Sequence, residues 1–367
     1  MRPPWFIIGR TAKPSTRRRP ISSALAVIAT MLKSRTAAAW IAVRPPYPDE
    51  LEWADDINTR AAKSLEELPL ALPEIHATLK DIRVEESDPS ASIARHLDAN
   101  LGGLRSSHFA LRKIACVVSF DDGGSIYPDG LLEAFTANQL GEAIDVAVSL
   151  AQIARPGSLG IGGGIVVVDG EVLAMVKRQW FLYGLHSGDN RASVWPPLQD
   201  IKLLEVCHWA KCLGAFSSSF ADGRIQRAFA ALCHALSLPS AQSGEILFRA
   251  MQGLEAFYSD GIGDLRRQLS EKSQLWLGST GQSANIVGHL YDLRSSYIHG
   301  SAKLSYPFNL HDGWNEDSKT NKRLTEGVEF AFRLLLATVQ RCIRDGVSDL
   351  YWKYKYEVQD NAPANGG

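Results

Sequence analysis

Hydrophobic residues recur at helical spacing through the second half of the chain. From Leu203 onward the sequence has no alternating apolar run of the kind that forms a strand. The spacing predicts helices over residues 225–238, 244–258, 265–277, 283–298 and 324–347. A long polar stretch separates the last two. We therefore expect an all-α helical bundle over residues 203–358, followed by a tail, 359–367, with the composition of a disordered segment.

Residues 49–200 combine strand patterns with helix patterns. Strand-forming runs are bounded by turn sequences, including an Asp-Gly pair typical of a two-residue hairpin turn. The predicted elements are a helix over 49–68, amphipathic segments over 75–84 and 93–104, a strand over 113–120, a turn over 121–124, a helix over 131–153, and a hairpin of strands 165–168 and 172–176. This half of the chain is therefore expected to be a mixed α/β region, which we regard as a possible sensor or regulator.

The predicted fold class is α+β overall, with the mixed region over 49–200 followed by the all-α bundle. The pair Pro196-Pro197 marks the expected boundary. With 367 residues, the chain is long enough for two domains. Hydrophobic residues make up 45% and charged residues 22%, which is the usage of an ordinary globular protein and excludes global disorder.

Residues 1–48 contain no Asp or Glu but many Arg and Lys. This composition is compatible with a transit peptide, with a basic arm that contacts nucleic acid, or with a chain whose translation begins at Met31. We favour the third interpretation, because several prolines interrupt the helix that a targeting peptide needs. We therefore expect a basic extension that is disordered or not part of the native protein, with ordered structure beginning near Pro48.

The formal net charge is −1, from 39 basic and 40 acidic residues. Proteins that bind nucleic acid often carry a strong basic excess, so an RNA-binding surface on this chain would have to be local. No apolar run approaches the roughly 18 residues that a membrane-spanning helix needs. We expect a protein of the cytoplasm that does not contact membranes.

The five cysteines are scattered, and no Cys-x-x-Cys pair occurs. A disulfide framework or a zinc site is not expected from this spacing. The glycine-rich segment 157–164 lacks the Gly-Lys-Ser/Thr ending of a phosphate-binding loop and is followed by a strand pattern. We therefore expect neither a metal ion nor another cofactor.

The segment 290–300, LYDLRSSYIHG, carries the most informative pattern in the chain. Its apolar residues continue one helical stripe, and Gly300 is placed to end the helix. On an ideal helix Asp292, Ser295 and His299 share a face, whereas Arg294 lies roughly 140° from His299. One copy of the helix therefore does not bring Arg294 and His299 together, which suggests a composite site formed by two copies.

An arginine and a histidine suit the cleavage of RNA by transesterification. Imidazole can take the proton of a ribose 2′-hydroxyl or protonate the leaving 5′-oxygen. Guanidinium can bind two phosphate oxygens and stabilise the charge of the transition state. RNA supplies its own nucleophile, so this chemistry needs no metal ion, and DNA is expected to resist. The same spacing also occurs where the arginine only pairs with an acid and the histidine only ends a helix.

The segment LYDLRSSYIHG resembles the signature of HEPN domains, specifically the ApeA-like branch, which ends a helix with an Arg-x4–6-His motif usually followed by glycine. The segments 246–258 and 263–269 are similar to earlier helices of that family, and the resemblance covers roughly residues 225–351. It implies a helical bundle, a homodimer formed through the motif helix, and in many members RNase activity. Such members are often toxins or antiphage-defence proteins that act on tRNA or other RNA.

The resemblance implies that Arg294 and His299 are catalytic. Ser295 departs from the Asn, Asp or His common after the arginine, and some HEPN domains are non-catalytic. Asp292 either orients His299 or forms a surface salt bridge, and Glu255 is either a supporting acid from a neighbouring helix or a solvated side chain. The alternative to an endoribonuclease is a HEPN scaffold for dimerisation or RNA binding, with the function in the N-terminal region. In a third alternative, supported by no motif, that region is itself an enzyme.

Overall fold

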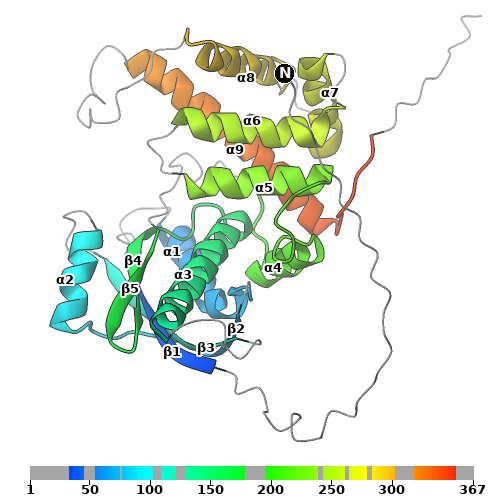
Figure 1. Ribbon diagram of the computed structural model, residues 1–367. Helices are drawn as coiled ribbons and strands as arrows, with labels where there is room; N and C mark the ends of the chain where they lie inside the picture. Colours follow the sequence, from blue (N-terminus) through cyan, green and yellow to red (C-terminus); the bar gives the residue numbers. More distant parts are fainter. Residues whose placement is uncertain are drawn as a thin grey trace, which may run out of the picture.

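The computed structural model describes residues 33–44, 54–74, 77–101, 109–120, 129–177, 195–238, 243–260, 264–278, 283–301 and 318–352. The predicted turn at 121–124, the polar stretch before the last helix and the tail 359–367 lie outside these ranges. The described part contains an antiparallel sheet followed in the sequence by helices (Figure 1). The α+β class is confirmed at this level.

Five strands form one antiparallel sheet in the order β2-β3-β1-β4-β5. Their bounds are β1 Lys33–Val43, β2 Thr78–Glu85, β3 Ala110–Phe120, β4 Ile161–Val168 and β5 Glu171–Val176. The helices are α1 Ala54–Glu67, a 3-10 turn η1 Leu68–Ala71, α2 Ala91–Asn100, α3 Asp129–Ala154, α4 Leu203–Cys212, α5 Arg224–Ser237, α6 Ser243–Tyr258, α7 Leu265–Leu277, α8 Ser283–Ile298 and α9 Ser318–Arg344. From residue 201 on, every described element is a helix.

The expectation that ordered structure begins near Pro48 was wrong. Strand β1 lies within the supposed basic extension and is the central strand, paired with β3 on one side and β4 on the other. Its alanines alternate between the two faces, and Ala37, Ala39 and Ile41 are buried against α3. Only residues 45–48 and those before Lys33 remain outside the described part of that extension.

The hairpin β4–β5 is confirmed, with its turn at the predicted Asp-Gly pair. Asp169 and Gly170 have φ of 50° and 88°, the left-handed values that a type I′ turn requires at both central residues. Before it, the glycine-rich segment allows a close approach of strands: a Cβ at Gly164 would overlap the Trp40 carbonyl oxygen of β1. Gly164 therefore permits the close pairing of β4 with β1.

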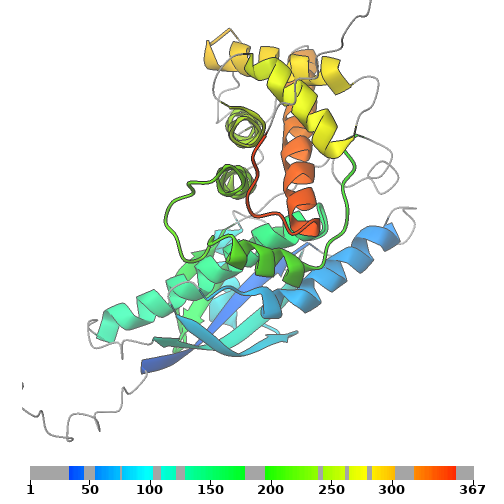
Figure 2. The same cartoon turned by 90° about the vertical axis from the view of Figure 1, so that its right-hand side faces the viewer.

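Helix α3 lies between the sheet and the C-terminal helices (Figures 1 and 2). Its C-terminal half is buried on nearly all sides, because the sheet covers one side and α4, α5 and α9 contact the other. The opposite face of the sheet carries a smaller apolar cluster, in which Trp40 and Ile165 pack with Leu97 of α2. The main core runs without a break from the sheet into the helical part across residues 198–203.

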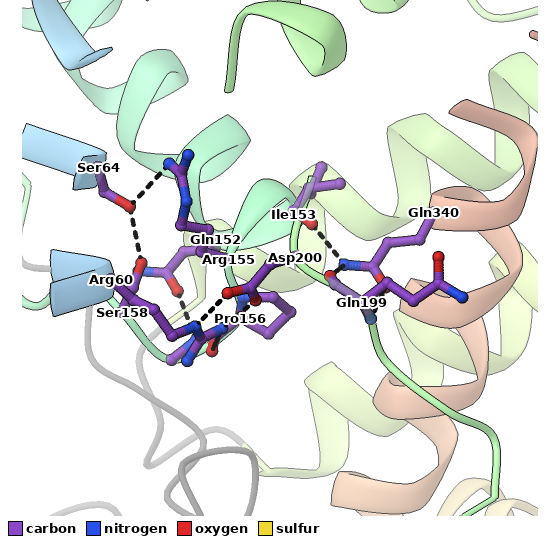
Figure 3. A network of polar contacts seen from close by, with 11 residues as sticks. Arg60, Ser64, Gln152, Ile153, Arg155, Pro156, Ser158, Gln199, Asp200 and Gln340 are labelled. Carbon is purple, nitrogen blue, oxygen red and sulfur yellow. Dashed lines mark hydrogen bonds and ion pairs between the residues drawn. The ribbon is translucent and has the colours of Figure 1, made fainter. Parts of the chain in front are cut away.

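Buried polar side chains reinforce the contact between the two parts (Figure 3). Arg60 of α1 is 3% exposed and donates from Nε and Nη2 to the Asp200 carboxylate, at 2.7 Å each. It also donates to the Pro156 carbonyl at 2.9 Å. On α9, Gln340 donates to the carbonyls of Ile153 and Gln199, at 2.8 Å each. Residues after α3 and before α4 are thereby bonded to α1 and α9.

Glu67, at the end of α1, completes this set of contacts. It accepts from Arg155 Nη2 at 2.6 Å and from the Leu203 backbone N–H at 2.7 Å. Burial acts to raise the pKa of Glu67, but these bonds outweigh it and lower the pKa. We call Arg60, Glu67, Arg155, Asp200 and Gln340 the junction network.

Candidate functional site

Helix α8, which carries the motif, packs against α6, α7 and α9 (Figure 1). Two glycines allow its side chains to approach neighbouring backbones closely. A Cβ at Gly244 of α6 would overlap the Tyr297 ring, and a Cβ at Gly327 of α9 would overlap Leu293. Tyr297 and Leu293 therefore fix the position and rotation of α8, because each occupies space that a side chain at Gly244 or Gly327 would fill.

Replacing Gly244 by alanine is expected to displace Tyr297 and lower the free energy of unfolding by about 1–3 kcal/mol. Gly141 of α3 is a matched control, because a Cβ there meets its nearest neighbours at 3.7 Å. Gly141→Ala is expected to be neutral or to stabilise by up to about 1 kcal/mol, since alanine favours helices. Urea unfolding of both variants measures the two changes. Equal losses would show that the Tyr297 contact does not hold α8 in place.

Arg294 points from α8 toward Glu255 of α6. Its Nη2 lies 3.4 Å from Glu255 Oε2, and the two side chains are 30% and 20% exposed. Arg294 Nε and Glu255 Oε1 are buried and have no hydrogen-bond partner within the described part of the chain. Glu255 is thus the neighbouring acid that the sequence suggested, but the ion pair leaves donors and acceptors of both groups unused.

Tyr291 is a third member of this cluster that the sequence analysis did not single out. It stands one helical turn before Arg294, and its buried hydroxyl interacts with the Glu255 carboxylate. Burial raises the pKa of the Tyr291 phenol, and the negative charge of Glu255 raises it further. The phenol therefore remains a potential proton donor at neutral pH. The sequence could have indicated Tyr291, because it stands three residues before Arg294 and therefore on the same side of the helix.

His299 follows the last residue of α8 and is exposed. The helix ends as predicted at Gly300, whose φ is 72°. The Gly300 N–H donates to the Tyr297 carbonyl and the Ser301 N–H to the Ser296 carbonyl, the two bonds of a Schellman motif. This ending holds the backbone of His299 while leaving its imidazole accessible to solvent.

The described residues show no contact between the side chains of Arg294 and His299. Asp292 lies 3.4 Å from Arg266 of α7, and both side chains are more than half exposed. Of the two expected roles for Asp292, the surface salt bridge is the one present. Ser295 is exposed on α8. The structure therefore brings Glu255 to Arg294 but leaves His299 apart from them within one copy of the chain.

All five cysteines are free thiols, and the described residues contain no cluster of metal ligands. Burial raises the pKa of Cys207, Cys233 and Cys342 to about 12, so these thiols stay protonated. Exposed Cys212 lies 3.6 Å from His208. In the described ranges, no three His, Cys, Asp or Glu side chains converge as a metal site would require.

Nor does any helix in the described ranges combine the length and apolar character needed to cross a bilayer. Comparisons with protein-family models, with curated proteins and with solved structures found no match for this chain.

Proposed function

We propose that this protein is an endoribonuclease of the HEPN type that needs no metal ion and uses Arg294 and His299. The proposal rests on the position of Arg294 and its contact with Glu255. Its guanidinium is held against Glu255 by one nitrogen, on the same helix that ends at an exposed histidine. The Arg294 side chain is 30% exposed, so guanidinium donors other than the buried Nε can bind the phosphate of RNA.

The proposed active form is a homodimer assembled through α8. Within one chain Arg294 turns toward α6 and His299 toward solvent, so a second α8 would be needed to complete the site. Ile298, beside His299, is 47% exposed and offers an apolar contact for such a partner. Two copies related by a twofold axis would form two equivalent composite sites.

The proposed reaction needs only the RNA and these side chains. A neutral His299 imidazole takes the proton of the 2′-hydroxyl, and the freed oxygen attacks the adjacent phosphorus. The bond from phosphorus to the 5′-oxygen breaks, and this oxygen takes a proton from an imidazolium. Arg294 binds the non-bridging oxygens as their charge grows, and the exposed Ser295 hydroxyl can donate a further hydrogen bond. The products carry a 2′,3′-cyclic phosphate and a 5′-hydroxyl.

The first experiment is cleavage of mixed tRNA by the full chain in the presence of EDTA, with His299→Ala as the comparison. We expect cleavage by the unmodified protein that survives EDTA and leaves 2′,3′-cyclic ends. The variant is expected to lose at least about 100-fold in rate, because one group supplies the proton transfers. Cleavage that EDTA abolishes, or that His299→Ala leaves unchanged, would contradict the mechanism.

The second candidate is a HEPN scaffold that dimerises or binds RNA without cutting it. The observation in its favour is that Glu255 already counters the charge of Arg294. Purified protein that dimerises, retains RNA and leaves it intact would support this function. In either case the proposed setting is the cytoplasm, and the endoribonuclease would act as a toxin or antiphage-defence effector on cellular RNA such as tRNA.

A further inference from the structure

A cavity of about 590 Å³ lies between α3, the end of β5, α5 and the loop that joins α4 to α5. It is far from the α8 motif in the fold, where the sheet part meets the helices (Figure 1). Its volume lies within the roughly 300–1,000 Å³ typical of small-molecule sites. The cavity is therefore large enough for an organic ligand rather than for an ion alone.

One side of the cavity is apolar. Val146 and Leu150 of α3 face it together with Phe216 of the loop and Phe229 and Cys233 of α5. Two phenylalanine rings can contact a flat apolar group, and their faces attract cations. The Cys233 thiol stays protonated, so it contributes apolar surface rather than charge.

Four of the five serines that line the cavity offer it acceptor oxygens rather than hydroxyl protons. The hydroxyls of Ser149, Ser217, Ser218 and Ser237 donate to backbone carbonyls, at 2.9, 3.3, 2.8 and 2.8 Å respectively. A carbonyl can only accept, so in each bond the hydroxyl proton is committed. The lone pairs on the hydroxyl oxygens of Ser217, Ser218 and Ser237 can accept hydrogen bonds.

Two carboxylates add acceptors and negative charge. Glu142 is exposed at the rim, and Asp145 lies one helical turn further along α3. Asp145 Oδ1 accepts from the Lys177 backbone N–H at 3.1 Å. Burial, with a smaller contribution from Glu142, raises the pKa of Asp145 to about 6, although Lys177 acts to lower it. The Lys177 ammonium is the one cation among the described lining residues.

We propose that this cavity binds an amphipathic organic cation. The aromatic or aliphatic body of the ligand lies against Phe216 and Phe229, and its ammonium or amidinium group donates to the serine oxygens and to Glu142 and Asp145. An anionic ligand is disfavoured, because it would face the carboxylates of Glu142 and Asp145 and four serine oxygens whose protons are donated to backbone carbonyls. This assignment does not depend on RNA cleavage.

The test is calorimetric titration of the full chain with tryptamine and, separately, with indole-3-acetate. The two share one ring and differ in the sign of their charge. We expect saturable binding of tryptamine and at least about ten-fold weaker binding of indole-3-acetate. Tryptamine affinity should also fall as the pH is lowered through about 6, where Asp145 takes up a proton.

Two variants and a control locate the binding. Glu142→Gln should weaken tryptamine several-fold, and Ala215→Trp, which places an indole at the cavity wall, should abolish binding. Glu205→Gln, an exposed carboxylate on α4 outside the cavity, should leave the affinity unchanged. Thermal melting confirms that each variant is folded. The proposal is overturned if tryptamine does not bind saturably, if indole-3-acetate binds as well, or if Ala215→Trp and Glu142→Gln bind tryptamine like the unmodified chain.

Discussion

Replacing Arg294 by methionine is expected to lower the rate of RNA cleavage at least about 100-fold, because the transition state loses the group that stabilises its charge. The variant should also be less stable, by about 1–3 kcal/mol, since Glu255 is left half-buried without its partner. Cleavage assays and urea unfolding measure the two losses. Because Arg294→Met lowers both stability and cleavage, this variant alone does not show whether cleavage is lost through unfolding.

The double variant Arg294→Met/Glu255→Gln separates them. Removing both charges should restore most of the stability while cleavage remains lost. Glu255→Gln alone keeps the guanidinium and should retain cleavage, whereas Arg294→Lys keeps the charge but not the paired donors and should be intermediate. If the double variant recovered cleavage together with stability, Arg294 would be a structural residue and the scaffold function would be favoured.

Asp200→Ala is expected to cost about 3–5 kcal/mol of unfolding free energy, the largest loss of stability among the variants considered. The Arg60 side chain is 4% exposed and, among the described residues, would keep just the Pro156 carbonyl as an acceptor. The opposite change, Arg60→Met, leaves a carboxylate that is 43% exposed and that water can solvate. It fills the same space with an apolar chain and is expected to cost only about 1–2 kcal/mol. Denaturant unfolding at neutral pH compares the two.

The informative result is the difference in unfolding free energy between Asp200→Ala and Arg60→Met. It follows from the unequal burial of the partners rather than from the strength of their bonds. Asp200→Asn is the control, because it keeps the shape and one acceptor oxygen and should lie between the other two. Equal losses, or a larger loss for Arg60→Met, would contradict the burial of Arg60 in the junction network.

The C-terminal helices were predictable because each buries one face. The expected helix over 225–238 is Arg224–Ser237, and that over 244–258 is Ser243–Tyr258. Local spacing alone specifies such a helix, since the stripe repeats every turn. The end of α8 at Gly300 was also predictable from the local sequence, because glycine adopts the required positive φ without strain.

Strand β1 was missed for physical reasons. Four of its eleven residues are alanine, a poor strand former, and its burial on both faces removes the alternation that marks a surface strand. Strand β2 was seen only as an amphipathic segment, since a bulge between Lys80 and Arg83 shifts its register. Both strands are specified by their partners, which lie far away in the sequence.

The candidate site was predictable in part. The segment 290–300 indicated Arg294 and His299, and helical packing then placed Glu255 against Arg294. The partner of Asp292 depended on where α7 lies, which no spacing within α8 determines. The junction network makes contacts up to 187 positions apart, between Gln340 and the Ile153 carbonyl, and Arg60 and Asp200 are 140 apart. No local pattern reveals such pairs.

The central place of β1 also governs how the chain folds. Ala37 lies opposite Cys116 in β3 and Val168 in β4. Both partner strands are therefore synthesised much later than β1. Such high contact order slows folding, because loop entropy is lost before the pairings compensate for it. Until β4 has emerged from the ribosome, one edge of this alanine-rich strand remains unpaired. The helices, whose contacts are closer in sequence, form on a faster timescale than the sheet they cover.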